Sequence, residues 1–85
     1  MIDKHERVLL AFGKTVKDRR IELGLSQEEF AGKAKLHRTY ISSLERGKRI
    51  LEFLNLIQIA QALELTPEEF LARVAGNMPG GLLKI

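Results

Sequence analysis

The sequence contains no cysteine, so neither a disulfide bond nor a thiolate-bound metal can stabilise its fold. No uninterrupted apolar run approaches the roughly 20 residues that a membrane-spanning helix requires. The residues at the N-terminus are mostly charged and lack the long apolar region of a signal peptide. Together these absences predict a cytoplasmic protein that has no membrane partner.

Groups of residues that would support catalysis or metal binding are also missing. His5 and His37 lie far apart in the sequence, and no cluster of acids accompanies either of them at the spacing of metal ligands. Two pairs of adjacent glutamates, at residues 28–29 and 68–69, each fall in the first turn of an expected helix, where negative charge complements the helix dipole. The sequence predicts neither an enzyme nor a binding site for a cofactor or small molecule.

The residues that are present favour one small globular domain. Of the 85 residues, 45% are hydrophobic and 29% are charged, which is typical of a folded chain with a small core. The net charge of +3 is unevenly distributed, because residues 35–49 hold five Lys or Arg and one acid, whereas residues 50–75 hold four acids and one Arg. A basic face and an acidic end suit a domain that binds phosphates on one side. Ordinary surface charge is the alternative interpretation.

The stretch at residues 26–49 is predicted to form two short helices joined by a tight turn. Ser26 and Glu29 have the spacing of a capping box, so a helix should open directly after Ser26. Ile41 and Leu44 follow at helical spacing and supply the buried side of a second helix. Two short helices at this separation are typical of a helix-turn-helix.

The outer face of the second of these helices is polar. At about 100° per residue, the side chains opposite the buried stripe are those of Thr39, Ser42, Ser43 and Arg46. Arg38 is expected at the N-terminal tip, where a recognition helix meets the edges of bases. The two serines are small enough to let the helix settle deep in a groove. A solvated polar face is the alternative interpretation of the same pattern.

Three further helices complete an all-α prediction. The first spans about residues 6–23 and ends at Gly24, although Gly13 should weaken it by up to about 1 kcal/mol relative to alanine. A later helix spans about residues 52–63, and the last, opened by a Thr-Pro-Glu-Glu start signal, spans residues 67–75.

The chain contains, in this order, the segments LGLSQEEFA, RTYISSLERGKR and IAQALELTPEEFL. In their order and spacing these segments resemble the Cro/C1-type (XRE) family of helix-turn-helix DNA-binding regulators. The resemblance covers residues 12–71, and the second segment is similar in particular to the controller proteins of restriction–modification systems. It implies a compact bundle of five helices like that of lambda repressor, with the DNA-binding domain at residues 1–76. Proline and glycine in residues 77–85 predict a flexible C-terminal tail.

The resemblance also implies which residues contact DNA. Gln27 should anchor to a phosphate or to the first base, and Arg38 should donate to O6 and N7 of a guanine. Neighbouring base edges would be read by Thr39, Ser42 and Ser43. The DNA backbone would be held by Tyr40, Arg46, Lys48 and Asn55. His37 is expected at the N-cap of the recognition helix, where it would cap the helix or contact a phosphate.

Two structural expectations concern charged residues. In the family, an arginine near the end of the first helix, here Arg20, commonly pairs with the glutamate that is Glu45 here. A buried pair would cost about 3–5 kcal/mol to break, against about 0–1 kcal/mol for two exposed charges, and we expect the pair. Lys35 and Glu64 stand where the family usually has glycine. A non-glycine residue in the left-handed conformation that the family commonly adopts there costs roughly 1–2 kcal/mol, so Lys35 implies either tolerated strain or a slightly different turn.

The predicted function is sequence-specific DNA binding for transcriptional control, by a homodimer on double-stranded DNA with a palindromic operator. Phe70, Leu71 and Val74 are expected to form the dimer interface, because they offer more apolar surface than a terminal helix needs for its own core. Alternatively, Phe70 and Leu71 cover the preceding helix and only Val74 is free. The chain end holds three apolar residues that are expected either to dock on a partner subunit or to be disordered, namely Leu82, Leu83 and Ile85.

A protein-interaction module is the alternative function. An antitoxin or co-regulator can use the same fold mainly to bind another protein, and no sensor domain is evident in the sequence. Neither the operator sequence nor the direction of regulation, activation or repression, is predicted.

Overall fold

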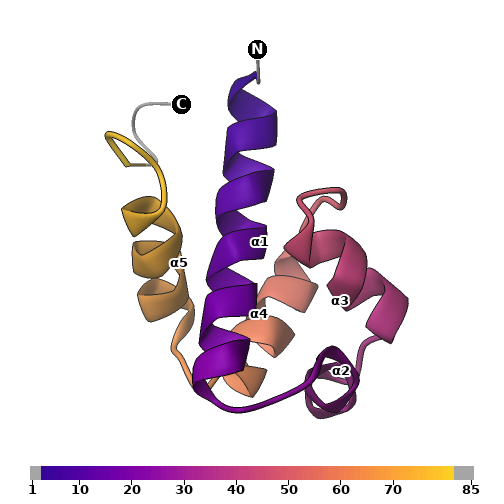
Figure 1. Ribbon diagram of the computed structural model, residues 1–85. Coiled ribbons are helices and arrows are strands. Elements are labelled where there is room, and N and C mark those ends of the chain that lie inside the picture. The colour runs from indigo at the N-terminus through magenta and orange to yellow at the C-terminus, as the bar shows by residue number, and fades with distance from the viewer. Residues whose placement is uncertain (1–2, 82–85) are drawn as a thin grey trace.

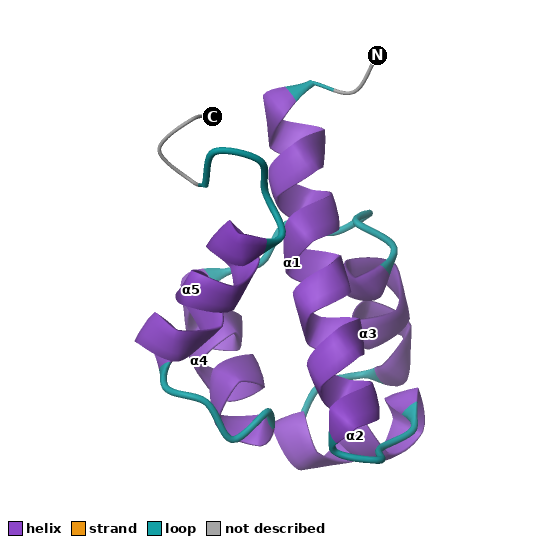
Figure 2. Ribbon diagram, turned by 60° about the vertical axis from the view of Figure 1, so that its left-hand side comes forward, coloured by secondary structure: helices purple, strands orange, loops and turns teal. Residues whose placement is uncertain are grey.

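The structure is a computed structural model that describes residues 3–81. Those residues form five helices and no strand: α1 (Lys4–Glu22), α2 (Gln27–Ala34), α3 (Arg38–Glu45), α4 (Phe53–Ala62) and α5 (Pro67–Gly76). Helix α1 stands in the middle, with α5 on one side and α2 and α3 on the other (Figure 1). The turned view in Figure 2 again places α5 and α3 on opposite sides of α1. The predicted all-α bundle of five helices is confirmed.

Local hydrogen bonds explain where α2 and α5 begin. The Ser26 hydroxyl accepts from the backbone N–H of Glu29 at 3.0 Å, and the Glu29 carboxylate accepts from the backbone N–H of Ser26 at 2.8 Å. Thr66 and Glu69 form the same capping box at α5, with distances of 3.1 and 2.8 Å. Because these backbone and hydroxyl groups stabilise the ionised carboxylates, the pKa of each glutamate lies below its usual value. Both predicted helix starts are confirmed.

The core lies where the inner faces of the helices meet. The rings of Phe12 and Phe70 pack with their centroids 5.7 Å apart and join α1 to α5. Each fully buried large apolar side chain stabilises the fold by about 1.5–3 kcal/mol relative to an exposed one. The largest of them are Phe30, Phe70, Ile41, Leu44, Ile59, Leu63, Val16 and Val74.

This packing corrects the interface predicted on α5. Phe70 and Val74 are fully buried inside the monomer, so neither is available to a second subunit. Leu71 alone of the three reaches the surface, with 36% exposed. The alternative that left Val74 free is also wrong. The reason is rotational: Phe70 and Val74 are about one turn apart and share the inner face, whereas Leu71 is turned about 100° away.

Gly13 has a packing role that its helix propensity did not suggest. A Cβ atom at this position would lie 2.5 Å from the carbonyl oxygen of Leu44 and 2.6 Å from that of Glu45. Those oxygens belong to the backbone at the end of α3, which cannot move aside cheaply. Glycine therefore lets α1 approach α3 closely, because any side chain here would separate the two helices.

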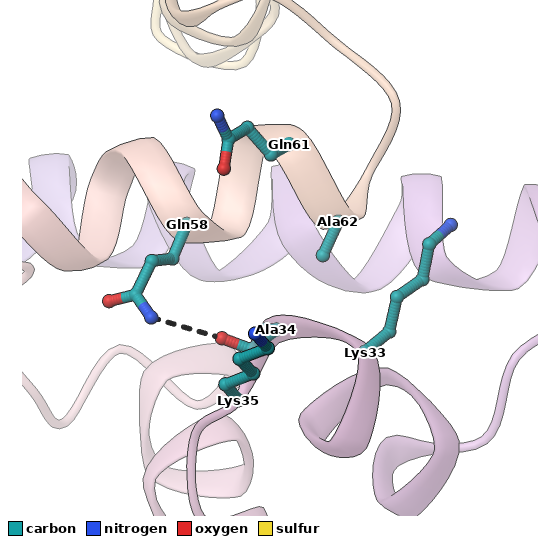
Figure 3. Close-up of a pocket in the computed structure, with 6 residues that line it drawn as sticks. All are labelled: Lys33, Ala34, Lys35, Gln58, Gln61 and Ala62. Carbon is teal, nitrogen blue, oxygen red and sulfur yellow. Dashed lines mark hydrogen bonds between the residues drawn. The ribbon is translucent and has the colours of Figure 1, made fainter.

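The two residues at family glycine positions adopt the left-handed conformation without being glycine. Lys35 ends α2 with φ 59°, and Glu64 follows α4 with φ 61°. Figure 3 shows how α4 supports the first of these turns: the Gln58 amide donates to the Ala34 carbonyl at 3.3 Å, beside Lys35. Ala34, Lys35 and Gln58 line a shallow hollow of about 320 Å³ between α2 and α4. Lys33 also lines this hollow and forms an ion pair of 2.8 Å with Glu64. These contacts of α2 with α4 and with the turn after α4 offset part of the backbone strain, which is about 1–2 kcal/mol per residue.

The packed domain extends slightly beyond its predicted end at residue 76. Met78 is only 7% exposed and belongs to the core, and the Asn77 side chain donates to the Thr15 hydroxyl of α1 at 2.8 Å. The predicted tail at residues 77–85 therefore includes two residues that pack on the domain. The contact proposed for Leu82, Leu83 and Ile85 lies outside the described residues.

Candidate nucleic-acid interface

Helices α2 and α3 form the predicted helix-turn-helix. The backbone N–H of Leu36 donates to the carbonyl of Ala31 at 3.0 Å and closes the end of α2. Ile41 and Leu44 are fully buried beneath α3, so the opposite face of this helix is directed to solvent. Along that face, Arg38, Thr39 and Arg46 are exposed, and Ser42 and Ser43 are partly buried.

A buried ion pair fixes the end of α3 to α1. Two nitrogens of the Arg20 guanidinium donate to the two carboxylate oxygens of Glu45, at 2.7 and 3.0 Å. A third nitrogen of Arg20 donates to the carbonyl of Leu25 at 2.8 Å. Only 10% of the Arg20 side chain and 3% of the Glu45 side chain are exposed. The hydrogen bond to Glu45 raises the pKa of Arg20 above its usual value, against the opposing effect of burial. The predicted pair is confirmed.

Gln27 takes part in the same network, which the sequence did not indicate. Its amide nitrogen donates to a carboxylate oxygen of Glu45 at 3.1 Å, and the residue is partly buried. An amide nitrogen carries two hydrogens, so a second donor is left for a phosphate or a base. The pair with Arg20 therefore positions Gln27 as well as the end of α3.

A second network holds the basic connector that follows α3. The Tyr40 hydroxyl donates to the backbone carbonyl of Ile50 at 3.4 Å and accepts from the Asn55 side chain at 3.2 Å. The guanidinium carbon of Arg49 lies 4.9 Å from the centroid of the Tyr40 ring, within the range of a cation–π contact. Tyr40 and Asn55 thus serve to position the connector, whatever contact each makes with DNA.

Comparison with known proteins identifies this unit. A family model described as helix-turn-helix matches residues 16–70, which include α2, the turn and α3. The chain belongs to the Cro/C1-type helix-turn-helix family. It is 40% identical to the control protein C.BamHI of Bacillus amyloliquefaciens over 65 residues, which is 75% of this chain and 80% of that protein.

Two solved structures of restriction–modification controller proteins resemble this helix-turn-helix protein. C.AhdI from Aeromonas hydrophila has 37% identity and a TM-score of 0.70, over 73% of this chain and 94% of that one. C.Esp1396I, solved as a tetramer in complex with its natural 35-base-pair operator, has 34% identity and a TM-score of 0.77. That match covers 82% of this chain and 92% of the other.

The outer face of this helix-turn-helix is cationic. Glu45 is the only acid between residues 35 and 49, and its charge is paired with Arg20 below the surface. No acid within this stretch therefore offsets the surface cations, which favours an anionic partner. The exposed cations in and after α3 are Arg38, Arg46, Lys48 and Arg49. Arg49 was not among the predicted contacts, although the basic cluster that contains it was noted.

His37 differs from one of its two expected roles. It is the N-cap residue of α3, but its side chain makes no capping hydrogen bond, so the expectation that it caps the helix is wrong. A histidine before a helix caps it only if its ring turns back toward the first turn of that helix. Here the residue is exposed at the tip of α3 beside Arg38, and its contact with a phosphate stays a prediction.

Residues 3–81 offer little else that resembles a ligand site. They contain no group of three or more His, Asp or Glu that could hold a metal ion. Among these residues, no helix is both long and apolar enough to cross a bilayer. The outer face of α3 and the connector after it are therefore the best candidate for the functional site.

Proposed function

We propose that this protein is a sequence-specific DNA-binding transcriptional regulator that inserts α3 into the major groove of its operator. The observation that carries the proposal is the outer face of α3, which combines small polar side chains with a cationic border and is fastened to α1 by the buried pair of Arg20 and Glu45. A rigid helix with such a face fits the major groove. The similarity to control proteins and to a controller solved on its operator supports the same function.

The residues on this face divide into two roles. Arg38, at the N-terminal tip of α3, donates to a guanine, while Thr39, Ser42 and Ser43 read neighbouring base edges. The DNA backbone is held by Gln27, His37, Tyr40, Arg46, Lys48, Arg49 and Asn55. For Gln27, Tyr40 and Asn55 the contact is made by side chains already held by bonds within the domain.

The regulator acts as a homodimer on a palindromic operator. A two-fold protein matches two half-sites about 34 Å apart, one helical turn of DNA. The resemblance to restriction–modification controllers, one of which is a tetramer on its operator, supports regulation through assembly of several subunits on DNA. Because its proposed ligand is operator DNA, we place the protein in the cytoplasm.

One titration series tests this function. An operator is first selected from random duplexes, and binding to the selected and to a scrambled duplex is then followed by fluorescence anisotropy at several salt concentrations. Arg38→Ala should cost about 1–3 kcal/mol on the selected site and relax the preference at one base position. Lys48→Ala should weaken both duplexes similarly and reduce the dependence of binding on salt.

Two results contradict the proposal. If no sequence is enriched from the random duplexes, binding is not sequence-specific. If Arg38→Ala lowers affinity equally for the selected and the scrambled duplex, Arg38 contacts the backbone and does not read a base.

A further inference from the structure

The turn of the helix-turn-helix is held from α4 by a residue that lies outside the DNA-binding face. The side chain of Gln58, which is partly buried, donates through its amide nitrogen to the backbone carbonyl of Ala34 at 3.3 Å (Figure 3). Ala34 is buried and is the last residue of α2. Its carbonyl is one of the four at a helix end that have no partner inside the helix, and a buried carbonyl left unpaired is costly.

This hydrogen bond acts on the peptide plane that leads into the strained turn. The carbonyl of Ala34 and the N–H of Lys35 belong to that plane, and the chain then rotates into the left-handed conformation at Lys35, with φ 59°. Gln58 holds the oxygen of the plane, while its N–H donates to the Gly32 carbonyl at 3.3 Å. A non-glycine residue is strained in this conformation, so a bond that holds the plane is a direct restraint on the turn.

We propose that Gln58 is a positioning residue for DNA recognition, because by holding the turn it sets the place of Arg38 at the tip of α3. The inference rests on the proposed function, in which Arg38 reads a guanine. The other end of α3 is fixed to α1 by the buried pair of Arg20 and Glu45. Eight residues of helix span about 12 Å, so a tilt of about 10° about that fixed end moves the tip by about 2 Å. A hydrogen bond to a base edge is lost over such a distance.

The ion pair between α2 and the turn after α4 does not have the same role. Lys33 and Glu64 lie 2.8 Å apart, but their side chains are 38% and 61% exposed. An exposed pair of this kind is weak and is screened by salt. The bond from Gln58 is made by a neutral, partly buried amide, so salt does not screen it in the same way. The restraint on the turn is therefore assigned to Gln58.

Titration of substituted proteins against the selected and the scrambled duplex tests this role. Gln58→Met keeps the length of the side chain but removes the donor. It should lower affinity for the selected duplex by about 5–10-fold, the effect of about one hydrogen bond, and leave the scrambled duplex within about twofold. The dependence of binding on salt should not change, because no phosphate contact is removed.

Gln61→Met is the matched control. Gln61 also lies on α4 and lines the same hollow, but Figure 3 shows that no hydrogen bond joins it to the other lining residues. The substitution should leave both affinities within about twofold. Circular dichroism verifies that each variant is folded, because a general loss of folded protein would weaken binding to both duplexes alike.

Two double substitutions separate positioning from a direct contact of Gln58 with DNA. In an Arg38→Ala background, Gln58→Met should cost less than about twofold, because the contact that it misplaces is already gone. In a Lys35→Gly background it should also cost less than about twofold, since glycine adopts the left-handed conformation without strain and the turn no longer depends on the bond. A side chain at Gln58 that touched DNA itself would lose the same factor in all three backgrounds, and that result overturns the inference.

A measurement without DNA shows whether the turn is released. The N–H groups of Lys35 and Leu36 donate to carbonyls near the end of α2. Their hydrogen exchange should become at least about 5-fold faster in Gln58→Met and stay unchanged in Gln61→Met. Unchanged exchange at both amides in Gln58→Met contradicts the inference, because the turn then does not depend on the bond.

Failure of the proposed function gives a different result. If the wild type selects an operator and Gln58→Met discriminates between the two duplexes as the wild type does, DNA recognition stands and the role of Gln58 is wrong. If the wild type enriches no sequence, the proposed function is wrong, and the role of Gln58 in recognition fails with it even where exchange at the turn is faster.

Discussion

Removing one partner of the buried ion pair of Arg20 and Glu45 should strongly destabilise this small domain, because the other charge is then left buried without compensation. Replacing Glu45 by glutamine keeps the shape of the side chain and one acceptor but leaves the Arg20 charge uncompensated. Breaking a buried pair costs about 3–5 kcal/mol, and because glutamine retains one hydrogen bond we expect a loss of about 2–3 kcal/mol. In a domain of this size each kcal/mol of lost stability lowers Tm by about 4–8 °C, so the expected fall in Tm is roughly 8–24 °C.

The double-mutant cycle isolates the pair itself. Arg20→Met should also destabilise the protein, since it removes the bond to the Leu25 carbonyl as well as both bonds to Glu45. With both changes present the two losses should not add, and the coupling free energy should reach about 1.5 kcal/mol or more. Urea unfolding of the four proteins, followed by circular dichroism, measures it. Additive losses would falsify the view that these residues act on each other.

Two controls sharpen the same experiment. Glu28→Gln removes an exposed carboxylate and should change the free energy of unfolding by no more than about 0.5 kcal/mol. The pKa of Arg20 is raised on folding by its hydrogen bond to Glu45, so its contribution to stability is complete below the pKa of the unfolded chain and would be lost only as pH rises through the still higher folded value. Arg20 therefore stays charged at both pH 6 and pH 8, and the coupling free energy should not weaken between them through loss of its charge.

Three other substitutions test how the helices are built. Gly13→Ala should destabilise the protein by about 1–3 kcal/mol in urea unfolding, because its Cβ would overlap the last carbonyl oxygens of α3, whereas Gly32→Ala, with open space around it, should stabilise α2 by up to about 1 kcal/mol. Equal and favourable effects at both glycines would show that α1 and α3 do not need the close approach. In the capping box of α2, folding lowers the pKa of Glu29 from its ordinary 4.5. Its contribution to stability is therefore present above that pH and disappears as pH falls through the lower folded value. Glu29→Gln should therefore reduce the acid-induced loss of stability between about pH 5 and pH 3, and an unchanged pH profile would contradict the capping-box interpretation.

Much of the candidate site could be predicted because it depends on local rules and on a family pattern. The polar face of α3 follows from the positions of Ile41 and Leu44, which are both buried as their spacing required. The pair of Arg20 and Glu45 came from the resemblance alone, since 25 positions separate the two residues and no local rule joins them. Gln27 and His37 were less well predicted, because what each side chain bonds depends on atoms brought near it only by folding.

The sequence by itself determined where α2 and α5 begin, and with the spacing of Ile41 and Leu44 it predicted the helix-turn-helix. The capping boxes at Ser26 and Thr66 each involve two residues three positions apart, so they are encoded locally, whereas the left-handed turn at Lys35 was implied only by the family pattern. Only the tertiary structure decided which faces of those helices are covered. Helical spacing groups Phe70 with Val74, but only the packing of α5 in the bundle shows that both are buried, whereas Phe53 and Leu54 at the start of α4 stay exposed. Burial depends on the neighbouring element, and a single helix does not specify its neighbour.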